Sequence, residues 1–366
     1  NSVAYTEKPD PGIFMKEWLS LYESKSGERG IFNRSSAQKK AAENGRRDAD
    51  WDFGTNPCSE IILRPNQFCN LTEVVVRAGD TVNSLTRKIR VATLLGTIQS
   101  TFTNFGYLRK RWQDNTEEER LLGVSLTGIM DSELLNGKEK GLEQTLEKLK
   151  QEAVNTNKVL AKKLGIPQST AITCVKPSGT VSQLVDSASG IHARHNPYYI
   201  RTVRGDNKDP LTEFLKASGI PSEPDVMKPD HTTVFSFPMM APKGSVCRTD
   251  MTAIQQLEIW KTYAKHWCEH KPSVTISVKE EEWVPVGSWC WENFEYLSGV
   301  SFLPFSDHTY QQAPYQDIDE KTYKKLVKAM PTTIDWTKLQ DFEKEDNTKG
   351  SQELACTAGV CELVDI

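Results

Sequence analysis

Residues 56–75 constrain this chain more than any other stretch, because they place two cysteines and Glu60 among turn-forming and apolar residues. Pro57 and Pro65 interrupt regular secondary structure on either side of Cys58, which predicts that this thiol lies on a loop tip or at a strand end. The apolar residues after Cys58 indicate a buried segment: Ile61, Ile62 and Leu63.

Asn56, Cys58 and Glu60 alternate along this stretch. In an extended segment, side chains two residues apart point to the same face, so an amide, a thiol and a carboxylate could act on one substrate. Cys69 adds a second thiol. The same residues also fit two buried structural cysteines and an exposed glutamate, since free cysteine often acts as a small hydrophobe. The residues of this stretch alone leave both interpretations open.

The string Asn-Pro-Cys-Ser-Glu-Ile, with the later Phe-Cys-Asn-Leu, resembles the finger loop of ribonucleotide reductases. It is most similar to the adenosylcobalamin-dependent (class II, monomeric type) ribonucleoside-triphosphate reductases. The resemblance implies that Cys58 carries a thiyl radical, that Glu60 handles the 3′-hydroxyl proton and that Asn56 holds the sugar. It also implies that Cys69 is half of the dithiol that reduces the 2′-position, and it places the partner thiol upstream of these residues.

Residues 169–185 form a second informative stretch. Their β-branched residues predict a strand that ends at the four residues Pro177, Ser178, Gly179 and Thr180, and the apolar residues that follow could open a helix. Backbone N–H groups at such a loop, with two hydroxyls, can bind an anion, although an ordinary strand-to-helix turn has the same pattern. The tetrapeptide resembles the substrate-phosphate loop of the same family, which implies that these four residues bind substrate.

Cys356 and Cys361 lie near the end of the chain, after a charged stretch that predicts a mobile tail. Half of a zinc site is an alternative, but no second pair of Cys or His accompanies them, so a reversible dithiol is the better interpretation. The family carries the same spacing at its C-terminus. The resemblance implies that this pair re-reduces the active-site disulfide and takes electrons from thioredoxin or a similar dithiol reductant.

The composition narrows the class of protein. A chain of 366 residues holds one large or two ordinary domains. A net charge of −4 does not favour a surface that binds nucleic acid. The sequence has no run of about 18 apolar residues, so no membrane span is predicted. Eight cysteines without a secretory signal favour reduced thiols and a cytoplasmic protein. Because the chain does not begin with Met, we expect a fragment that lacks its N-terminal part.

Apolar periodicity predicts four helices: one that starts near residue 12, one from a cap at Asp80 to about residue 103, one within residues 116–135, and one over residues 141–164. Residues 233–237 and 273–278 read as strands on either side of a helix over 251–268, which predicts a parallel βαβ unit. Residues 299–305 read as one more strand. The alternation predicts an α/β fold, and the resemblance implies the second half of a ten-stranded α/β barrel with the finger loop inside it.

The expected organisation has three parts. Residues 1–305 belong to the catalytic barrel, with the finger loop near 56–73 and the phosphate loop at 177–180. Residues 306–345, which include a helix near 320–330, form a small appendage, and residues 346–366 form a mobile redox tail.

His192 and His195 have no Cys or carboxylate at zinc-site spacing, so we predict no metal site and expect hydrogen-bonded side chains near the rim of the active site. The resemblance implies adenosylcobalamin as the cofactor. The Asp-x-His-x-x-Gly signature of base-off cobalamin proteins is absent from this sequence, so no histidine is predicted to bind cobalt.

Two alternatives remain beside the main interpretation, which is radical reduction of ribonucleotides to deoxyribonucleotides. One is a class I large subunit, which receives its radical through a tyrosine pair; Tyr198 and Tyr199 form the only adjacent pair in this chain. The other is a catalytically incomplete, nucleotide-binding dithiol module. The resemblance favours triphosphate substrates and requires no oligomer, but the residues themselves do not distinguish diphosphates from triphosphates.

Overall fold

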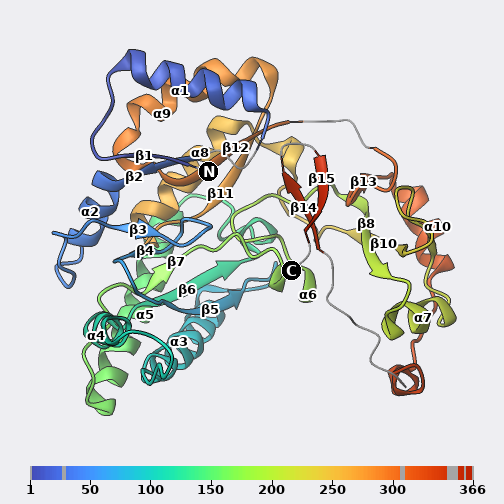
Figure 1. Ribbon diagram of the computed structural model, residues 1–366, viewed down its shortest axis with the longest axis horizontal. Coiled ribbons are helices and arrows are strands. Elements are labelled where there is room, and N and C mark those ends of the chain that lie inside the picture. Colours follow the sequence, from blue (N-terminus) through green and yellow to red (C-terminus); the bar gives the residue numbers. More distant parts are fainter. Residues whose placement is uncertain (1, 27–29, 306–309, 344–352, 358–359, 365–366) are drawn as a thin grey trace. The chain divides into compact units, whose positions relative to one another are not determined.

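The computed structural model describes residues 2–26, 30–305, 310–343, 353–357 and 360–364 (Figure 1). The chain folds into two compact units. The first comprises Asn1–Arg194 and Lys243–Phe305, and the second His195–Pro242 and Ser306–Ile366. Within the described ranges, none of the helices combines the length and the apolar character that crossing a bilayer requires. The expected division after residues 305 and 345 stays a prediction.

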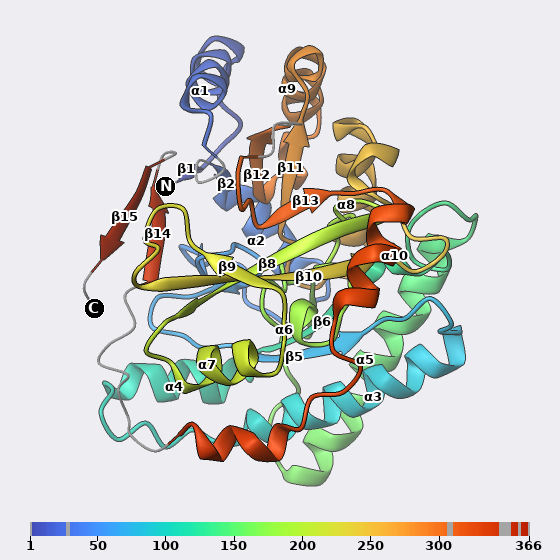
Figure 2. The same ribbon diagram turned by 90° about the vertical axis from the view of Figure 1, so that its right-hand side faces the viewer.

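A three-stranded parallel sheet forms one part of the first unit, in the order β5 (Asn70–Val75), β6 (Leu122–Thr127) and β7 (Thr173–Cys174). The connections are helical: α3 (Val82–Gln99) and α4 (Lys110–Glu119) precede β6, and α5 (Leu142–Leu164) precedes β7. Helix α3 packs against β5, β6 and α5 (Figure 2). This packing leaves all six residues of β6 buried.

The helix predicted within residues 116–135 is wrong. Helix α4 ends at Glu119, Arg120 adopts a left-handed φ of 47°, and the chain then enters β6. Over Leu122–Thr127, large apolar residues alternate with Gly, Ser and Thr, and all six are buried because a central strand of a parallel sheet is covered on both faces. This two-residue alternation is typical of a strand and contradicts the predicted helix.

Helices α3 and α5 form where the sequence predicted them, apart from the N-terminal cap of α3. The buried face of α5 includes Leu146 and Leu149, and Gly165 ends the helix with a φ of 68°, as predicted. Helix α3 forms, but its cap is Thr81 and not Asp80: Thr81 accepts the N–H of Ser84 in a reciprocal capping box. The carboxylate of Asp80 instead pairs with Lys88 at 2.6 Å.

A second sheet of the first unit has the order β1 (Ser2–Tyr5), β2 (Gly30–Asn33), β12 (Ser298–Pro304) and β11 (Val274–Val278). The β1–β2 and β11–β12 pairs are parallel, and β2 and β12 are antiparallel. A parallel bridge between Val175 and Pro272 joins the end of β7 to the chain that enters β11. The helices of this part are α1 (Pro11–Ser24), α2 (Arg34–Ala42), α8 (Ala253–His266) and α9 (Trp283–Glu292). The described strands form no closed barrel.

The second unit contains an antiparallel sheet in the order β13 (Tyr315–Asp317), β8 (Tyr198–Asp206), β10 (Thr232–Met240) and β9 (Ser222–Pro224). Its helices are α7 (Pro210–Ala217) and α10 (Glu320–Ala329), and a hairpin of β14 (Glu353–Thr357) and β15 (Val360–Val364) follows. The predicted βαβ unit is therefore wrong. Its strands and helix exist, but β10 and β11 lie in different sheets, and linear spacing cannot show which sheet a strand joins.

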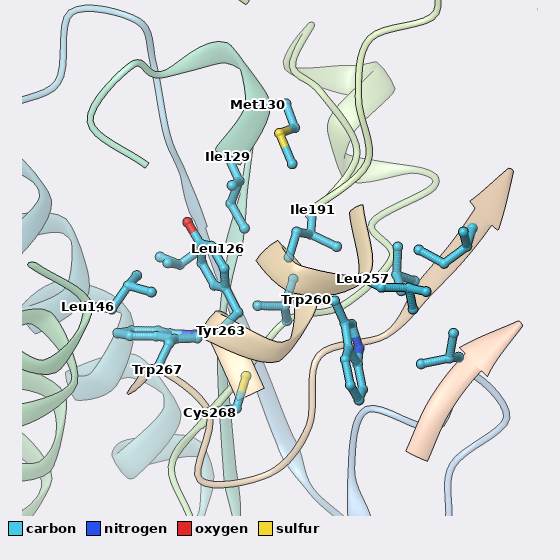
Figure 3. Packing of buried hydrophobic residues seen from close by; sticks show 14 of the residues in the cluster. Leu126, Ile129, Met130, Leu146, Ile191, Leu257, Trp260, Tyr263, Trp267 and Cys268 are labelled. Carbon is cyan, nitrogen blue, oxygen red and sulfur yellow. The ribbon is translucent and has the colours of Figure 1, made fainter. Parts of the chain in front are cut away.

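A single large cluster of apolar residues forms the core of the first unit (Figure 3). Three aromatic residues of the α8 region lie at its centre with none of their surface exposed: Trp260, Tyr263 and Trp267. Each donates its polar hydrogen to a backbone carbonyl, of Pro272, Leu135 and Cys174 respectively. Large aromatic side chains stabilise a core most when their polar atoms are paired in this way. The bond of Trp267, which directly follows α8, connects this region to the end of β7, near the candidate site.

Candidate active site

The loop that carries Cys58 is a short hairpin. Strands β3 (Gly54–Thr55) and β4 (Ile62–Leu63) pair antiparallel, and residues 56–61 connect them. The carbonyl of Asn56 accepts the N–H of Ser59 at 2.9 Å, and its side-chain oxygen accepts the N–H of Ile61 at 3.0 Å. The predicted loop tip is confirmed. The extended conformation is wrong, because Ser59 has a left-handed φ of 63° that turns the chain.

This turn gives Cys58 and Glu60 opposite environments. Cys58 is exposed, whereas Glu60 keeps 1% of its surface accessible. Loss of solvation raises the pKa of Glu60; a hydrogen bond from the Asn56 side chain and the charge of Lys176 oppose this rise. The other carboxylate oxygen, Oε2, is buried and has no hydrogen-bond partner among the described residues. Asn56 and Glu60 therefore interact directly, and one Glu60 oxygen remains available to a further donor.

The thiol of Cys58 is held in its protonated form. Its pKa is raised by loss of solvation at the sulfur and by the nearby Glu60 carboxylate, while Lys176 lowers it. Sulfur, carboxylate and ammonium therefore lie within electrostatic range of one another. Sequence reasoning did not single out Lys176, which directly precedes the predicted phosphate loop and belongs to no motif of its own.

Distant residues fix the base of this hairpin. Ile62 donates its N–H to Nδ1 of His270 at 3.3 Å, and Nε2 of His270 contacts the carbonyl of Leu122 at 2.9 Å. Burial lowers the pKa of His270 to about 3, so the ring is neutral, and the Ile62 bond assigns its proton to Nε2. Lys271 donates its backbone N–H to the carbonyl of Glu60 at 2.9 Å. No local sequence signal pointed to His270 or Lys271.

Cys69 lies directly before β5, and burial raises its pKa well above the ordinary value. Glu60 and Glu119 raise it further, whereas Arg47 lowers it. Cys69 in turn contributes to the raised pKa of Cys174 on β7. The structure thus brings Cys69 within electrostatic range of Glu60 and of a buried thiol that belongs to no sequence motif.

The predicted phosphate loop connects β7 to the four-residue helix α6 (Val181–Leu184). The predicted strand before the loop is shorter than expected, since only Thr173 and Cys174 pair as strand residues. Ser178 is buried with a left-handed φ of 50°, and its hydroxyl has no partner among the described residues. Gly179 and Thr180 are exposed. The loop therefore combines an unsatisfied buried hydroxyl with an accessible backbone.

The segment after this loop packs closely on Lys176. A Cβ atom on Gly190 would lie 2.2 Å from the Lys176 carbonyl oxygen, so only glycine fits here. His192 is hydrogen-bonded, as expected: Nδ1 contacts the Ser189 carbonyl at 2.9 Å, and Nε2 accepts the N–H of Thr275 at 3.0 Å. His195 belongs to the second unit, where Nε2 lies 2.7 Å from Asp317.

The terminal cysteines lie on the β14–β15 hairpin, whose backbone register pairs Cys356 with Cys361. Their side chains fall outside the described part of the chain, as do residues 344–352, 358–359 and 365–366. The mobile redox tail therefore stays a prediction.

No family model matches the chain. Among curated proteins, it is 29% identical over 331 residues to the probable adenosylcobalamin-dependent ribonucleoside-triphosphate reductase of Dictyostelium discoideum, which covers 85% of this chain and 40% of that protein. It is 26% identical over 380 residues to the adenosylcobalamin-dependent ribonucleoside-triphosphate reductase of Lactobacillus leichmannii, which covers 92% of this chain and 50% of that protein. The chain spans half or less of the length of these relatives.

Solved structures show the same relationship at the level of the fold. A B12-dependent (class II) ribonucleotide reductase matches with a TM-score of 0.77 and 23% identity, over 94% of this chain and 51% of that one. The alpha subunit of the Actinobacillus ureae class Id ribonucleotide reductase matches less well, with a TM-score of 0.55 and 13% identity over 83% of this chain and 65% of that one. These matches confirm the resemblance expected from residues 56–75. Over most of its length, the chain is similar to part of the adenosylcobalamin-dependent ribonucleoside-triphosphate reductases, and its mixed α/β fold matches that of a class II enzyme.

Proposed function

We propose that this chain is part of a ribonucleotide reductase that converts ribonucleotides, as triphosphates, to 2′-deoxyribonucleotides. One arrangement carries the proposal: an exposed thiol, Cys58, shares a six-residue loop with Glu60, a buried carboxyl whose second oxygen has no partner in the described structure. Asn56 of the same loop donates to that carboxyl. The similarity of most of the chain to class II reductases supports the same activity.

In this proposal, Cys58 abstracts the 3′-hydrogen of the ribose as a thiyl radical. The raised pKa of Cys58 keeps its S–H bond intact, and its exposure lets an organic radical reach it, so the thiol fits a radical cofactor. Adenosylcobalamin is the cofactor that we propose, and when bound it supplies that organic radical. Cys58 is the residue that would face it.

Glu60 acts as the general base for the 3′-hydroxyl. Its raised pKa brings it nearer to neutral pH, where general bases work best, and its free oxygen can accept the hydroxyl proton. Asn56 orients the sugar while it holds the other carboxylate oxygen.

The 2′-hydroxyl leaves as water, and two thiols supply the reducing electrons as they become a disulfide. Cys69 is one of them, and the resemblance places its partner upstream of this chain. We propose that Cys356 and Cys361 then reduce this disulfide by thiol exchange and are themselves reduced by thioredoxin or a similar dithiol protein.

We assign the substrate phosphates to residues 177–180. The accessible backbone at Gly179 and Thr180 and the unpaired hydroxyl of Ser178 are the donors that such a group requires. Pro177 sets the start of the loop. A ten-stranded barrel with residues 56–73 as its finger loop, completed by polypeptide outside this chain, is part of the same proposal, as is a cytoplasmic location.

A class I large subunit is the less favoured alternative. The class II structure matches this fold better than the class Id subunit does, and the relatives are named as adenosylcobalamin-dependent. The Tyr198–Tyr199 pair that a class I enzyme would use lies at the start of β8, where Tyr199 is buried with 5% of its surface exposed.

The test is deoxynucleotide formation by a full-length polypeptide that contains this chain. We expect product with adenosylcobalamin and none with a tyrosyl-radical subunit, and the reverse result would identify a class I enzyme. Absence of product with either, while nucleotide still binds, would leave a catalytically incomplete dithiol module.

A further inference from the structure

A cavity of about 260 Å³ in the first unit is lined by residues from three separate segments. The first is the end of α2 (Arg34–Ala42) with the turn that follows it, the second is α5, and the third is the chain after α8. None of the lining residues belongs to the loop at 56–61 or to residues 177–180. The reaction proposed above therefore gives this cavity no role.

The charges around this cavity do not cancel. Glu269 is paired with Arg46, whose Nη2 lies 2.6 Å away, and Glu43 is paired with Lys40 at 2.5 Å. Lys150 is half-buried and makes no hydrogen bond or ion pair with any described residue, although Glu269 and Glu147 lie within electrostatic range of its ammonium group. Both carboxylates of the cavity thus already have a cation, and one ammonium group is left over.

The positive groups are held in place without a ligand. Arg46 donates from Nε to the Ser169 carbonyl at 3.2 Å, and Lys40 donates to the Ala264 carbonyl at 2.7 Å. Since these side chains are already ordered, a ligand would lose little affinity to immobilising them.

Burial and the charge of Lys40 both disfavour the charged form of Lys150. Burial lowers the pKa of Lys150, with the charge of Lys40 as a second cause, although Glu269 and Glu147 oppose the shift. Burial and Lys40 also lower the pKa of Lys271 to about 7. An anion in the cavity would stabilise the charged form of Lys150, which lines it.

We propose that this cavity binds a small phosphate-type anion, with Lys150 and Arg46 as its direct contacts and Lys40 as a supporting charge. Guanidinium and ammonium groups are the usual protein donors to phosphate oxygens. The volume lies below the range of about 300–1,000 Å³ that drug-sized ligands occupy, so the anion is small. The cavity is separate from the proposed substrate-phosphate loop.

Inorganic phosphate is the probe, measured by equilibrium dialysis against the purified chain at constant ionic strength. We expect one phosphate per chain. Lys150→Gln should weaken binding about tenfold to a hundredfold, which is the worth of one hydrogen bond to a charged group. Lys148→Gln, an exposed lysine on the same helix outside the cavity, is the matched control and should bind as wild type does.

Gln151 offers a second variant that removes no cation. Its side chain lines the cavity and is exposed, so Gln151→Glu should leave the fold intact, add a repulsive charge and weaken phosphate binding. A nucleoside monophosphate tested in the same way shows whether a phosphoryl group on a larger molecule also enters: Lys150-dependent binding of both ligands supports a general phosphoryl site, and binding of phosphate alone supports a free ion. No binding of millimolar phosphate to the wild-type chain, or equal binding by the wild type and Lys150→Gln, would overturn the proposal.

Discussion

Cys58 and Glu60 lie two residues apart in one loop, yet Cys58 is exposed whereas only 1% of the surface of Glu60 is accessible. The left-handed backbone of Ser59 between them turns their side chains toward different surroundings. An accessible thiol can meet a reagent from solution, while a buried carboxyl is shielded from water. The two groups can therefore be tested separately.

Cys58→Ser should abolish nucleotide reduction, because an O–H bond is too strong to be oxidised in place of the thiol. Since Cys58 is exposed, the free energy of unfolding should change by less than about 0.5 kcal/mol, and nucleotide binding should persist. Product formation in the full-length enzyme and urea unfolding check the two parts. Turnover at the wild-type rate would remove the radical role from Cys58.

Glu60→Gln should lower the rate by about 10²–10⁴-fold, the range expected for loss of a general base. In wild type, the rate should rise with pH through a pKa that lies above that of an ordinary glutamate. Steady-state kinetics across pH test both expectations. An unchanged rate would mean that proton transfer occurs elsewhere.

Glu60→Gln should lower the rate but raise the free energy of unfolding at neutral pH. Burial raises the folded-state pKa of Glu60, so the folded chain binds more protons than the unfolded chain between the two pKa values, and stability falls as pH rises through that interval. Gln cannot ionise, so Glu60→Gln removes this pH-dependent loss of stability. The variant should therefore be more stable than wild type at neutral pH and equal to it in acid, as measured by urea unfolding at both pH values. Glu139→Gln, at an exposed position, should show no such difference.

Gly123→Ala should destabilise the first unit by about 1–3 kcal/mol, because the new methyl group would clash with the side chains packed around Gly123 on β6. Its Cβ would lie 2.4 Å from Cδ2 of Leu71 and 3.2 Å from Cδ1 of Ile61. Gly79→Ala is the control, since a Cβ there meets nothing within 4 Å. Denaturant unfolding of both variants measures the difference. Equal unfolding midpoints for Gly123→Ala and Gly79→Ala would mean that the side chains around Gly123 can move to accept the methyl group.

Replacing both Cys356 and Cys361 with Ser should spare the first turnover, because the proposed dithiol that contains Cys69 starts reduced. Multiple turnover with thioredoxin should fail, and dithiothreitol should partly restore it, since a small dithiol can reach a buried disulfide that a protein cannot. A structural role predicts loss of stability and of the first turnover together. Single-turnover product in the double variant therefore decides between the two roles, and its absence would exclude the shuttle.

Local patterns predicted the elements that local chemistry determines. The apolar spacing of α5 and its terminal Gly165 were sufficient to place that helix, and β11 and β12 followed from short β-branched and apolar runs. The strand at Leu122–Thr127 has the two-residue alternation of a strand, but its sequence does not show that its Gly, Ser and Thr residues are also buried, because other elements cover that face.

The candidate site shows the same limit. The resemblance of residues 56–75 to a known finger loop, and not their residue types alone, marked them as a chemical site, but the positive φ of Ser59 has no signature in a non-glycine residue. The burial of Glu60 also depends on Lys271, which is far away in sequence and holds the Glu60 carbonyl. Sequence could locate the reactive groups but not their exposures, because partners from other segments decide these.

The bond between Ile62 and His270 joins residues 208 positions apart in the chain. Contacts of such sequence separation form only after a large loop has closed, at a cost in chain entropy, so they tend to slow folding. The hairpin that presents Cys58 can take its anchored shape only once β6, β7 and the segment after α8 have come together. During synthesis, a nascent chain that ends before residue 270 would carry the thiol on an unanchored loop, which delays the appearance of an organised candidate site until most of the first unit has emerged.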